Sequence, residues 1–83
     1  MLNVLYFASL REAFGKENEK MALPVPADVS GLIAALRVRG GIWSDALGAD
    51  KRWRVAVNQE MAAMNTPLKP GDEVAIFPPV TGG

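Results

Sequence analysis

The sequence predicts an α+β fold in which one main helix packs against a small mixed sheet of about five strands. Strand-like apolar runs lie near both ends of the chain, at residues 2–8 and 72–77. A single apolar stripe with helical spacing lies between them, at residues 29–36. Proline and glycine separate the shorter apolar runs, so we expect the other elements, including short extra helices, to be brief.

Composition narrows the size and the class of the protein. A chain of 83 residues suits one domain, and 49% apolar with 22% charged residues is typical of a soluble globular protein. Nine basic and nine acidic residues cancel, so we expect no binding to nucleic acid. No run reaches the length of a membrane span and no signal-peptide pattern is present, so we expect a cytoplasmic protein without membrane contact. Without cysteine or histidine, we expect no disulfide, no metal site and no cofactor bound by this chain.

The N-terminal run at residues 2–8 is nearly continuous in apolar character, which predicts a central strand. Ser9 is expected to cap a short helix over residues 10–14, with Glu12 as its capping-box partner. Gly15 is well placed to end that helix.

A polar turn at residues 16–20 then leads into Met21-Ala22-Leu23, which predicts an edge strand. Pro24 and Pro26 end this strand, because proline cannot donate a hydrogen bond to the ladder.

The main helix is predicted to begin after Asp28, whose side chain can cap its first turn. Arg37 and Arg39 are expected in its last turn, where cations favour the helix dipole, and Gly40-Gly41 ends it. The residues expected to face the sheet recur at helical spacing: Val29, Leu32, Ile33 and Leu36.

The second half of the chain predicts shorter elements. Trp43 and Leu47 are four residues apart and can form a helical turn over one end of the core. Residues 53–57 alternate and are β-branched, which predicts a third strand, and a turn leads from it into the short apolar run at residues 61–64.

Pro70-Gly71 is the strongest turn signal in the chain and precedes the last strand, at residues 72–77. The first and last strands are the most apolar, so we expect them side by side at the centre of the sheet. The long connection between them contains the helix, which favours a parallel pair. This arrangement is the ubiquitin-like β-grasp, predicted here for residues 1–77.

One local cluster of basic residues lies at Lys51, Arg52 and Arg54. The simpler interpretation is a solvated strand edge, and the alternative is a docking patch for an acidic partner.

Residues 78–83 predict an extended C-terminal Gly-Gly tail. Pro78 and Pro79 stop the sheet and favour a stiff, extended exit from it. Gly82 and Gly83 have no side chains, so they can enter a channel too narrow for other residues. A Gly-Gly end can also be an ordinary flexible terminus.

The reactive group of such a tail is the α-carboxylate of Gly83, which is ionised near neutral pH and is a poor electrophile. If a partner enzyme adenylates it with ATP, it can accept a nucleophile such as sulfide, an amine or a thiol. Because the chain has no cysteine, any sulfur that it carries must reside on this carboxylate.

The sequence does not predict a catalyst. Asp72 and Glu73 are neighbours in a strand, so they point to opposite faces and make a poor acid–base pair. Asp72 is better placed for turn chemistry after Gly71. We expect the catalytic groups to belong to partners. We also expect an exposed apolar patch at the base of the tail, with Phe77 and Val80 as its candidate members. Phe77 is equally compatible with a core position.

The chain resembles the small sulfur-carrier subunit of molybdopterin synthase over nearly its whole length. The similarity lies in Val4 to Glu12, in Val57-Asn58-Gln59-Glu60, and most strongly in Thr66 to Gly83, which combines Gly-Asp-Glu-Val, Phe-Pro-Pro-Val and Gly-Gly. The segment from Gly40 to Arg52 matches least.

The resemblance implies that an E1-like adenylating enzyme uses ATP to form an acyl-adenylate at Gly83, which becomes a thiocarboxylate. The tail would then enter the large catalytic subunit of molybdopterin synthase and deliver sulfur to cyclic pyranopterin monophosphate, building the molybdopterin dithiolene in a heterotetramer. Carried over by position, Gly82 would pass the narrow channel. The residues that would guide the tail are Phe77, Pro78, Pro79, Val80 and Thr81.

Three rival functions remain. The first is a sulfur carrier for another pathway, such as thiamine biosynthesis, although such carriers are typically shorter and lack the Phe-Pro-Pro-Val segment. The second is a ubiquitin-like protein modifier, whose activated glycine passes to target lysines. The third is an interaction module with an incidental tail, which would keep its function without Gly82 and Gly83.

Overall fold

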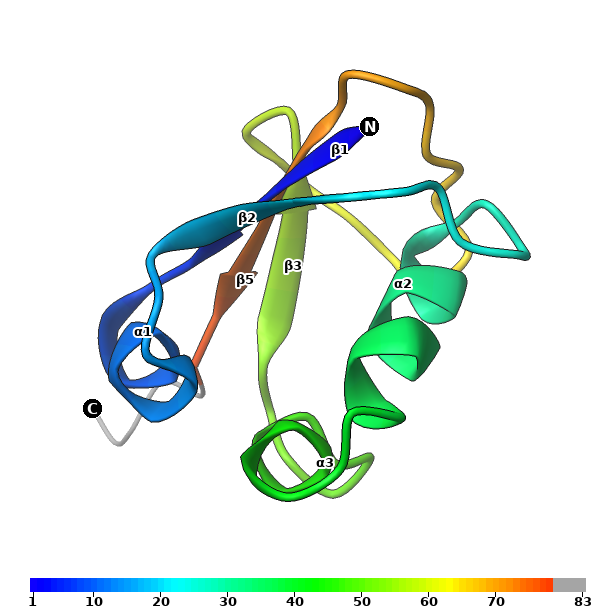
Figure 1. Ribbon diagram of the computed structural model, residues 1–83. Coiled ribbons are helices and arrows are strands. Elements are labelled where there is room, and N and C mark those ends of the chain that lie inside the picture. Colours follow the sequence, from blue (N-terminus) through cyan, green and yellow to red (C-terminus); the bar gives the residue numbers. More distant parts are fainter. Residues whose placement is uncertain (79–83) are drawn as a thin grey trace.

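The computed structural model describes residues 1–78. They form an α+β fold with a five-stranded mixed sheet in the order β2-β1-β5-β3-β4, and α2 and α3 lie on one side of it (Figure 1). The strands are β1 (Leu2–Tyr6), β2 (Asn18–Met21), β3 (Arg54–Val57), β4 (Glu60–Met61) and β5 (Glu73–Phe77). The helices are α1 (Ala8–Phe14), α2 (Val29–Arg37) and α3 (Ile42–Ala46).

The centre of the sheet joins the two ends of the described chain. β1 and β5 pair in parallel, with Asn3 opposite Glu73 and Tyr6 opposite Ile76. β2 and β3 flank this pair in antiparallel orientation, and β4 pairs with the outer side of β3. The predicted central, parallel pairing of the first and last strands is confirmed.

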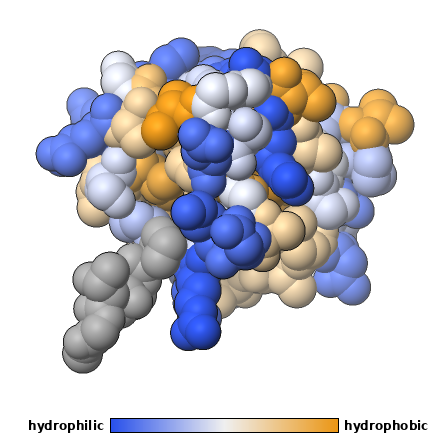
Figure 2. Space-filling model, turned by 90° about the horizontal axis from the view of Figure 1, so that it is seen from below, coloured by the Kyte–Doolittle hydropathy of each residue, from blue (hydrophilic) through white to orange (hydrophobic). Residues whose placement is uncertain are grey.

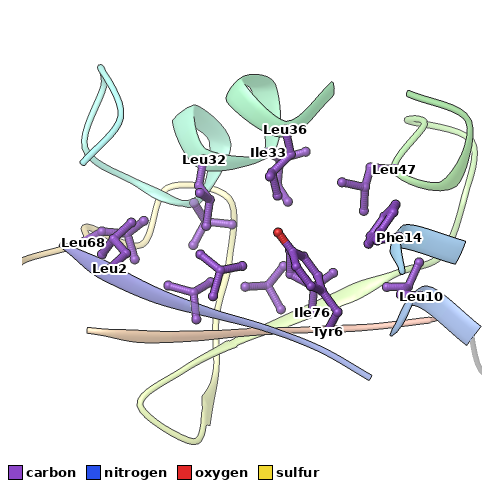
Figure 3. Close-up of a cluster of buried hydrophobic side chains, with 14 residues drawn as sticks. Leu2, Tyr6, Leu10, Phe14, Leu32, Ile33, Leu36, Leu47, Leu68 and Ile76 are labelled. Carbon is purple, nitrogen blue, oxygen red and sulfur yellow. The ribbon is translucent and has the colours of Figure 1, made fainter. Parts of the chain in front are cut away.

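α2 covers the inner face of the sheet as predicted. Asp28 is its N-cap, and the Asp28 Oδ1 accepts a hydrogen bond from the Gly31 backbone N–H at 2.9 Å. The predicted stripe is buried against β1, β3 and β5 (Figure 3). The most buried side chains of this core are Leu2, Val4, Leu32, Leu36, Leu47, Val74 and Ile76.

The prediction for the start of α1 is wrong. The helix begins at Ala8, its N-cap is Phe7, and no side chain caps it, so Ser9 lies within the first turn. Burial of Leu10 and Phe14 therefore places this helix, and not a capping box. Its predicted end is confirmed, because Gly15 adopts φ 73° and donates its N–H to the Arg11 carbonyl.

The second strand lies earlier than predicted. β2 begins at Asn18 within the charged stretch and ends at Met21, so Leu23 is outside it. Its register is set by β1, with Leu5 opposite Asn18 and Leu2 opposite Met21. A strand at the sheet edge tolerates charged side chains because one of its faces and one of its sides meet water.

A polar network joins β2 to the segment after α2. The Tyr6 hydroxyl donates to Glu19 Oε2 at 2.5 Å, and Arg39 donates to both Glu19 carboxylate oxygens at 2.9 Å. The hydrogen bond from Arg39 holds the pKa of Glu19 below its usual range. Burial, and then the bond to Glu19, raise the pKa of Tyr6. α2 ends at Arg37, so Arg39 is not in its last turn as predicted and makes this long-range contact instead.

α3 closes one end of the core. Leu47 is fully buried, and the Trp43 ring stacks on Phe14 with the ring centroids 3.9 Å apart. The Arg39 guanidinium lies 4.4 Å from the Trp43 ring centroid. The predicted helical turn over the end of the core is confirmed.

Candidate functional site

The predicted tail begins where β5 ends. Phe77 is the last residue of β5, and Pro78, which is half-buried, is the last residue that the structure describes. The other residues predicted for the site, Pro79, Val80, Thr81, Gly82 and Gly83, lie outside the described part of the chain. The structure therefore locates the point from which the tail starts.

This starting point is held from both sides. Ladder bonds link β5 to β1 and to β3, and Arg54 lies directly opposite Phe77 in the β3–β5 register. Beyond the last β1 residue, the Phe7 backbone N–H still donates to the Ile76 carbonyl at 3.2 Å. The residue before the tail is thus part of a strand that is paired on both sides.

Two aromatic rings mark the base of the tail. Phe7 and Phe77 stack with their centroids 4.8 Å apart and their planes 12° apart. Phe77 is half-buried, and Phe7 is 40% exposed. The sequence singled out Phe77 but missed Phe7. The signal that could have found it is the parallel pairing itself, because parallel strands end at the same edge of a sheet.

The sheet face turned away from α2 carries further apolar side chains. Cross-strand register places four of them in one row, which we call the outer row: Leu5, Ala75, Ala56 and Met61. Met61 at the end of this row is 63% exposed. Phe77 is two residues after Ala75 and therefore lies on the same face. Figure 2 views the molecule from below Figure 1, the side on which α1 and α3 lie, and shows apolar and hydrophilic residues next to one another on that surface.

Asp72, which directly precedes β5, stabilises a turn, as predicted. Asp72 accepts hydrogen bonds from the Asn58 side-chain amide at 3.0 Å and from the Lys69 backbone N–H at 2.9 Å. The hydrogen bond from Asn58, and to a smaller extent the one from Lys69, holds the pKa of Asp72 below its usual range. The carboxylate stabilises the turn before β5.

Residues 1–78 contain neither a metal-binding cluster nor a membrane-spanning helix. No group of three histidine, cysteine, aspartate or glutamate side chains in this part of the chain could hold a metal ion. None of its helices is both long enough and apolar enough to cross a membrane.

Comparison with known proteins gives a consistent family. Residues 4–83 match the model of the ThiS family. The molybdopterin synthase sulfur carrier subunit of Escherichia coli (strain K12) is 41% identical over 83 residues, with all of both chains covered.

Solved structures agree with this match. A candidate subunit 1 of molybdopterin converting factor from Pyrococcus furiosus is 31% identical and has a TM-score of 0.80, with 95% of this chain and 97% of that chain covered. A chain from the complex of subunits 1 and 2 of the molybdopterin-converting factor of Helicobacter pylori is 30% identical and has a TM-score of 0.67, with 99% and 97% covered. The chain belongs to the ThiS family and, within it, to the sulfur carrier subunits of molybdopterin synthase.

Proposed function

We propose that this carrier subunit holds its sulfur as a thiocarboxylate on Gly83, at the end of a tail formed by residues 78–83 on a β-grasp domain formed by residues 1–77. One observation supports this most directly. The central strand of the sheet ends at Phe77, six residues before Gly83 in the Gly-Gly pair, in a chain that has no cysteine to carry sulfur. In this proposal the folded domain is the part that partner proteins bind, and the chemistry takes place on the tail.

The proposed reaction cycle balances in three steps. The Gly83 carboxylate attacks the α-phosphorus of ATP in an E1-like adenylating enzyme, which forms an acyl-adenylate and releases pyrophosphate. A sulfide nucleophile then forms a C–S bond and displaces AMP, leaving the thiocarboxylate. In the large subunit, the thiocarboxylate sulfur attacks a carbon of cyclic pyranopterin monophosphate and displaces an oxygen substituent from it. Water then cleaves the resulting thioester, which leaves a thiol on the pterin and restores the Gly83 carboxylate.

The residues before Gly83 suit insertion into a partner. Gly82 permits passage through a narrow channel because it has no side chain. Ordering a tail of six residues would cost roughly 1–2 kcal/mol per residue, and Pro78 and Pro79 lower this cost by restricting the free ensemble. Val80 and Thr81 then supply the side-chain contacts that guide the tail.

The partner surface at the base of the tail is proposed to be the Phe7–Phe77 pair together with Met61, the exposed end of the outer row, since Ala56 and Ala75 in that row are buried. Exposed apolar side chains that rim a reactive segment are typical of docking sites. The complex of subunits 1 and 2 from Helicobacter pylori supports the large subunit as the partner. The assembly of the two subunits as a heterotetramer is part of the proposal and follows from the family resemblance. The chain itself would bind no cofactor and supply no catalytic side chain.

The experiment that tests the carrier chemistry is the intact mass of the protein from cells containing its adenylating enzyme and a sulfur source. We expect a species heavier by the replacement of one oxygen by sulfur, mapped to Gly83 and missing when Gly83 is deleted. An unmodified carboxylate under these conditions would refute the thiocarboxylate. Isopeptide-linked adducts on cellular lysines would point to the modifier function instead.

A second experiment tests the docking surface. Phe7→Ala should weaken binding to the large subunit by about tenfold or more, since buried aromatic anchors commonly contribute more than 1 kcal/mol to an interface. Leu23→Ala is a matched control, because Leu23 is 36% exposed but lies on the loop before α2, away from the base of the tail. Equal affinities of the two variants, measured by calorimetry, would remove Phe7 from the interface.

A further inference from the structure

A groove with a basic rim lies beside the edge strand β4. It has a volume of about 410 Å³ and runs between the β3–β4 edge and the start of α2. We call it the basic groove. Its cationic lining residues are Lys51, Arg52 and Arg54, and its apolar ones include Val29, Met61 and Met64.

The three cations of the groove are exposed and have no salt bridge within residues 1–78. The two salt bridges formed in this part of the chain both use Glu19, on the opposite edge strand of the sheet. The chain as a whole has no net charge, so these three unpaired cations form a local excess of positive charge and do not merely reflect a basic protein. This arrangement favours an anionic partner.

The groove also offers apolar contact. Met61 is 63% exposed and Met64 is 45% exposed. Methionine side chains adapt to irregular partner surfaces because they are unbranched and polarizable. The chemistry of the groove therefore fits a segment in which carboxylates alternate with an apolar side chain.

The position of the groove relates it to the tail. Arg54 faces Phe77 across the β3–β5 ladder, so the groove begins one strand away from the residue at which the tail starts. Six residues from Pro78 to Gly83 can span at most about 20 Å when fully extended. A protein that receives Gly83 in an interior active site must therefore bring the mouth of its channel against this end of the sheet.

We propose that the basic groove docks an acidic segment of the large synthase subunit, next to the mouth of the channel that receives the tail. This inference rests on the proposed function. The cations would steer the approach of the large subunit and fix its orientation, and the two methionines would pack against an apolar side chain between its carboxylates. The groove thus adds a charged contact to the apolar one made by the Phe7–Phe77 pair, and Met61 belongs to both the groove and the outer row.

The test is the association rate between this chain and the large subunit from the same organism, measured by stopped flow at several salt concentrations. The double variant Lys51→Glu/Arg52→Glu reverses two cations of the groove. Lys20→Glu/Arg37→Glu makes the same change of net charge at exposed positions on β2 and α2 and is the matched control. Thermal unfolding of each variant shows whether it is folded.

We expect the groove variant to associate about tenfold more slowly than the wild type at low salt, with a smaller dependence on salt, and the control to stay within about threefold. Equal rates for both variants, or slowing by the same factor in both, would overturn the inference. So would an effect confined to binding of the adenylating enzyme, since the groove would then serve a different partner.

The failure of this inference can be told apart from that of the proposed function. If wild-type protein acquires the thiocarboxylate and transfers sulfur but the groove variant associates normally, the groove alone is wrong. If wild-type Gly83 never acquires sulfur, the proposed function fails whatever the association rates are.

Discussion

At the scale of single residues, Gly31 is required by a close approach of two backbone segments. A Cβ at this position would lie 2.0 Å from the Pro26 carbonyl oxygen, which is backbone and cannot swing away. Alanine normally favours a helix over glycine by about 1 kcal/mol, but here we expect Gly31→Ala to destabilise the protein by about 1–3 kcal/mol.

Urea unfolding measures this effect, and Ala34→Gly on the exposed side of α2 is its control. The control should lose about 1 kcal/mol through helix propensity alone. Stabilisation by Gly31→Ala would show that Pro26 can move away.

Ala8 presents the opposite case, a residue with a side chain where glycine would fit better. Its φ of 51° lies in the left-handed region, which costs an L-residue about 1–2 kcal/mol. Because glycine loses more conformational entropy on folding, we expect Ala8→Gly to raise the free energy of unfolding by only up to about 1 kcal/mol. Ala13→Gly, at an exposed position within α1, should lower it by about the same amount. If both changes destabilise equally in thermal unfolding, Ala8 is not strained.

At the scale of elements, the Glu19–Arg39 pair fastens the segment after α2 to the edge strand β2. The pKa of Glu19 is lowered chiefly by its hydrogen bond with Arg39, so the folded state favours the ionised carboxylate. This contribution to stability is fully present above the ordinary pKa of 4.5 and is lost as the pH falls through the lowered value. We expect Glu19→Gln to destabilise the protein at pH 7 by about 1–3 kcal/mol.

Unfolding measured between pH 2 and pH 7 should show wild type and Glu19→Gln converging at the acidic end. Asp28 and Asp72 also have lowered pKa values, so both proteins should still lose stability in acid. Glu12→Gln, at an exposed position on α1, should follow the wild-type curve. A constant gap between wild type and Glu19→Gln at all pH values would show that the charge of Glu19 does not matter.

The elements also show what the sequence could and could not predict. α2 was predictable because its cap and its stripe are both local patterns within residues 28–36. The start of β2 was not, since an edge strand with charged residues takes its limits from the register of its partner and not from its own pattern. The contact between Glu19 and Arg39 joins residues 20 positions apart, and only the folded chain brings them together.

The candidate site, too, was only partly predictable from the sequence. The glycines and prolines were visible because their backbones have unusual conformational properties, and Phe77 was visible because it directly precedes the two prolines. Phe7 was missed even though the predicted parallel pairing brings the ends of the first and last strands to one edge of the sheet. Its stacking on Phe77 is seen only in the folded chain. The basic groove could be named only as a cluster of cations, since its apolar lining comes from Met61 and Met64 on another segment.

At the scale of the whole molecule, the boundary between domain and tail can be tested by truncation. A chain that ends at residue 77 keeps all five described strands and should unfold at nearly the same temperature as the full chain, yet accept no sulfur. A chain that ends at residue 72 lacks β5, which leaves β1 and β3 without their common neighbour, and we expect it to be unfolded by circular dichroism. A folded chain ending at residue 72 would show that β5 is dispensable.

The central place of β5 also has a consequence during synthesis. The ribosome makes β5 after every other described strand, and β1 must wait for it to complete the middle of the sheet. A chain interrupted before β5 would therefore have no assembled sheet to offer to an activating enzyme. Only an interruption between Phe77 and Gly83 would leave a folded domain without the reactive carboxylate, so the window for making an inactive but folded carrier is six residues long.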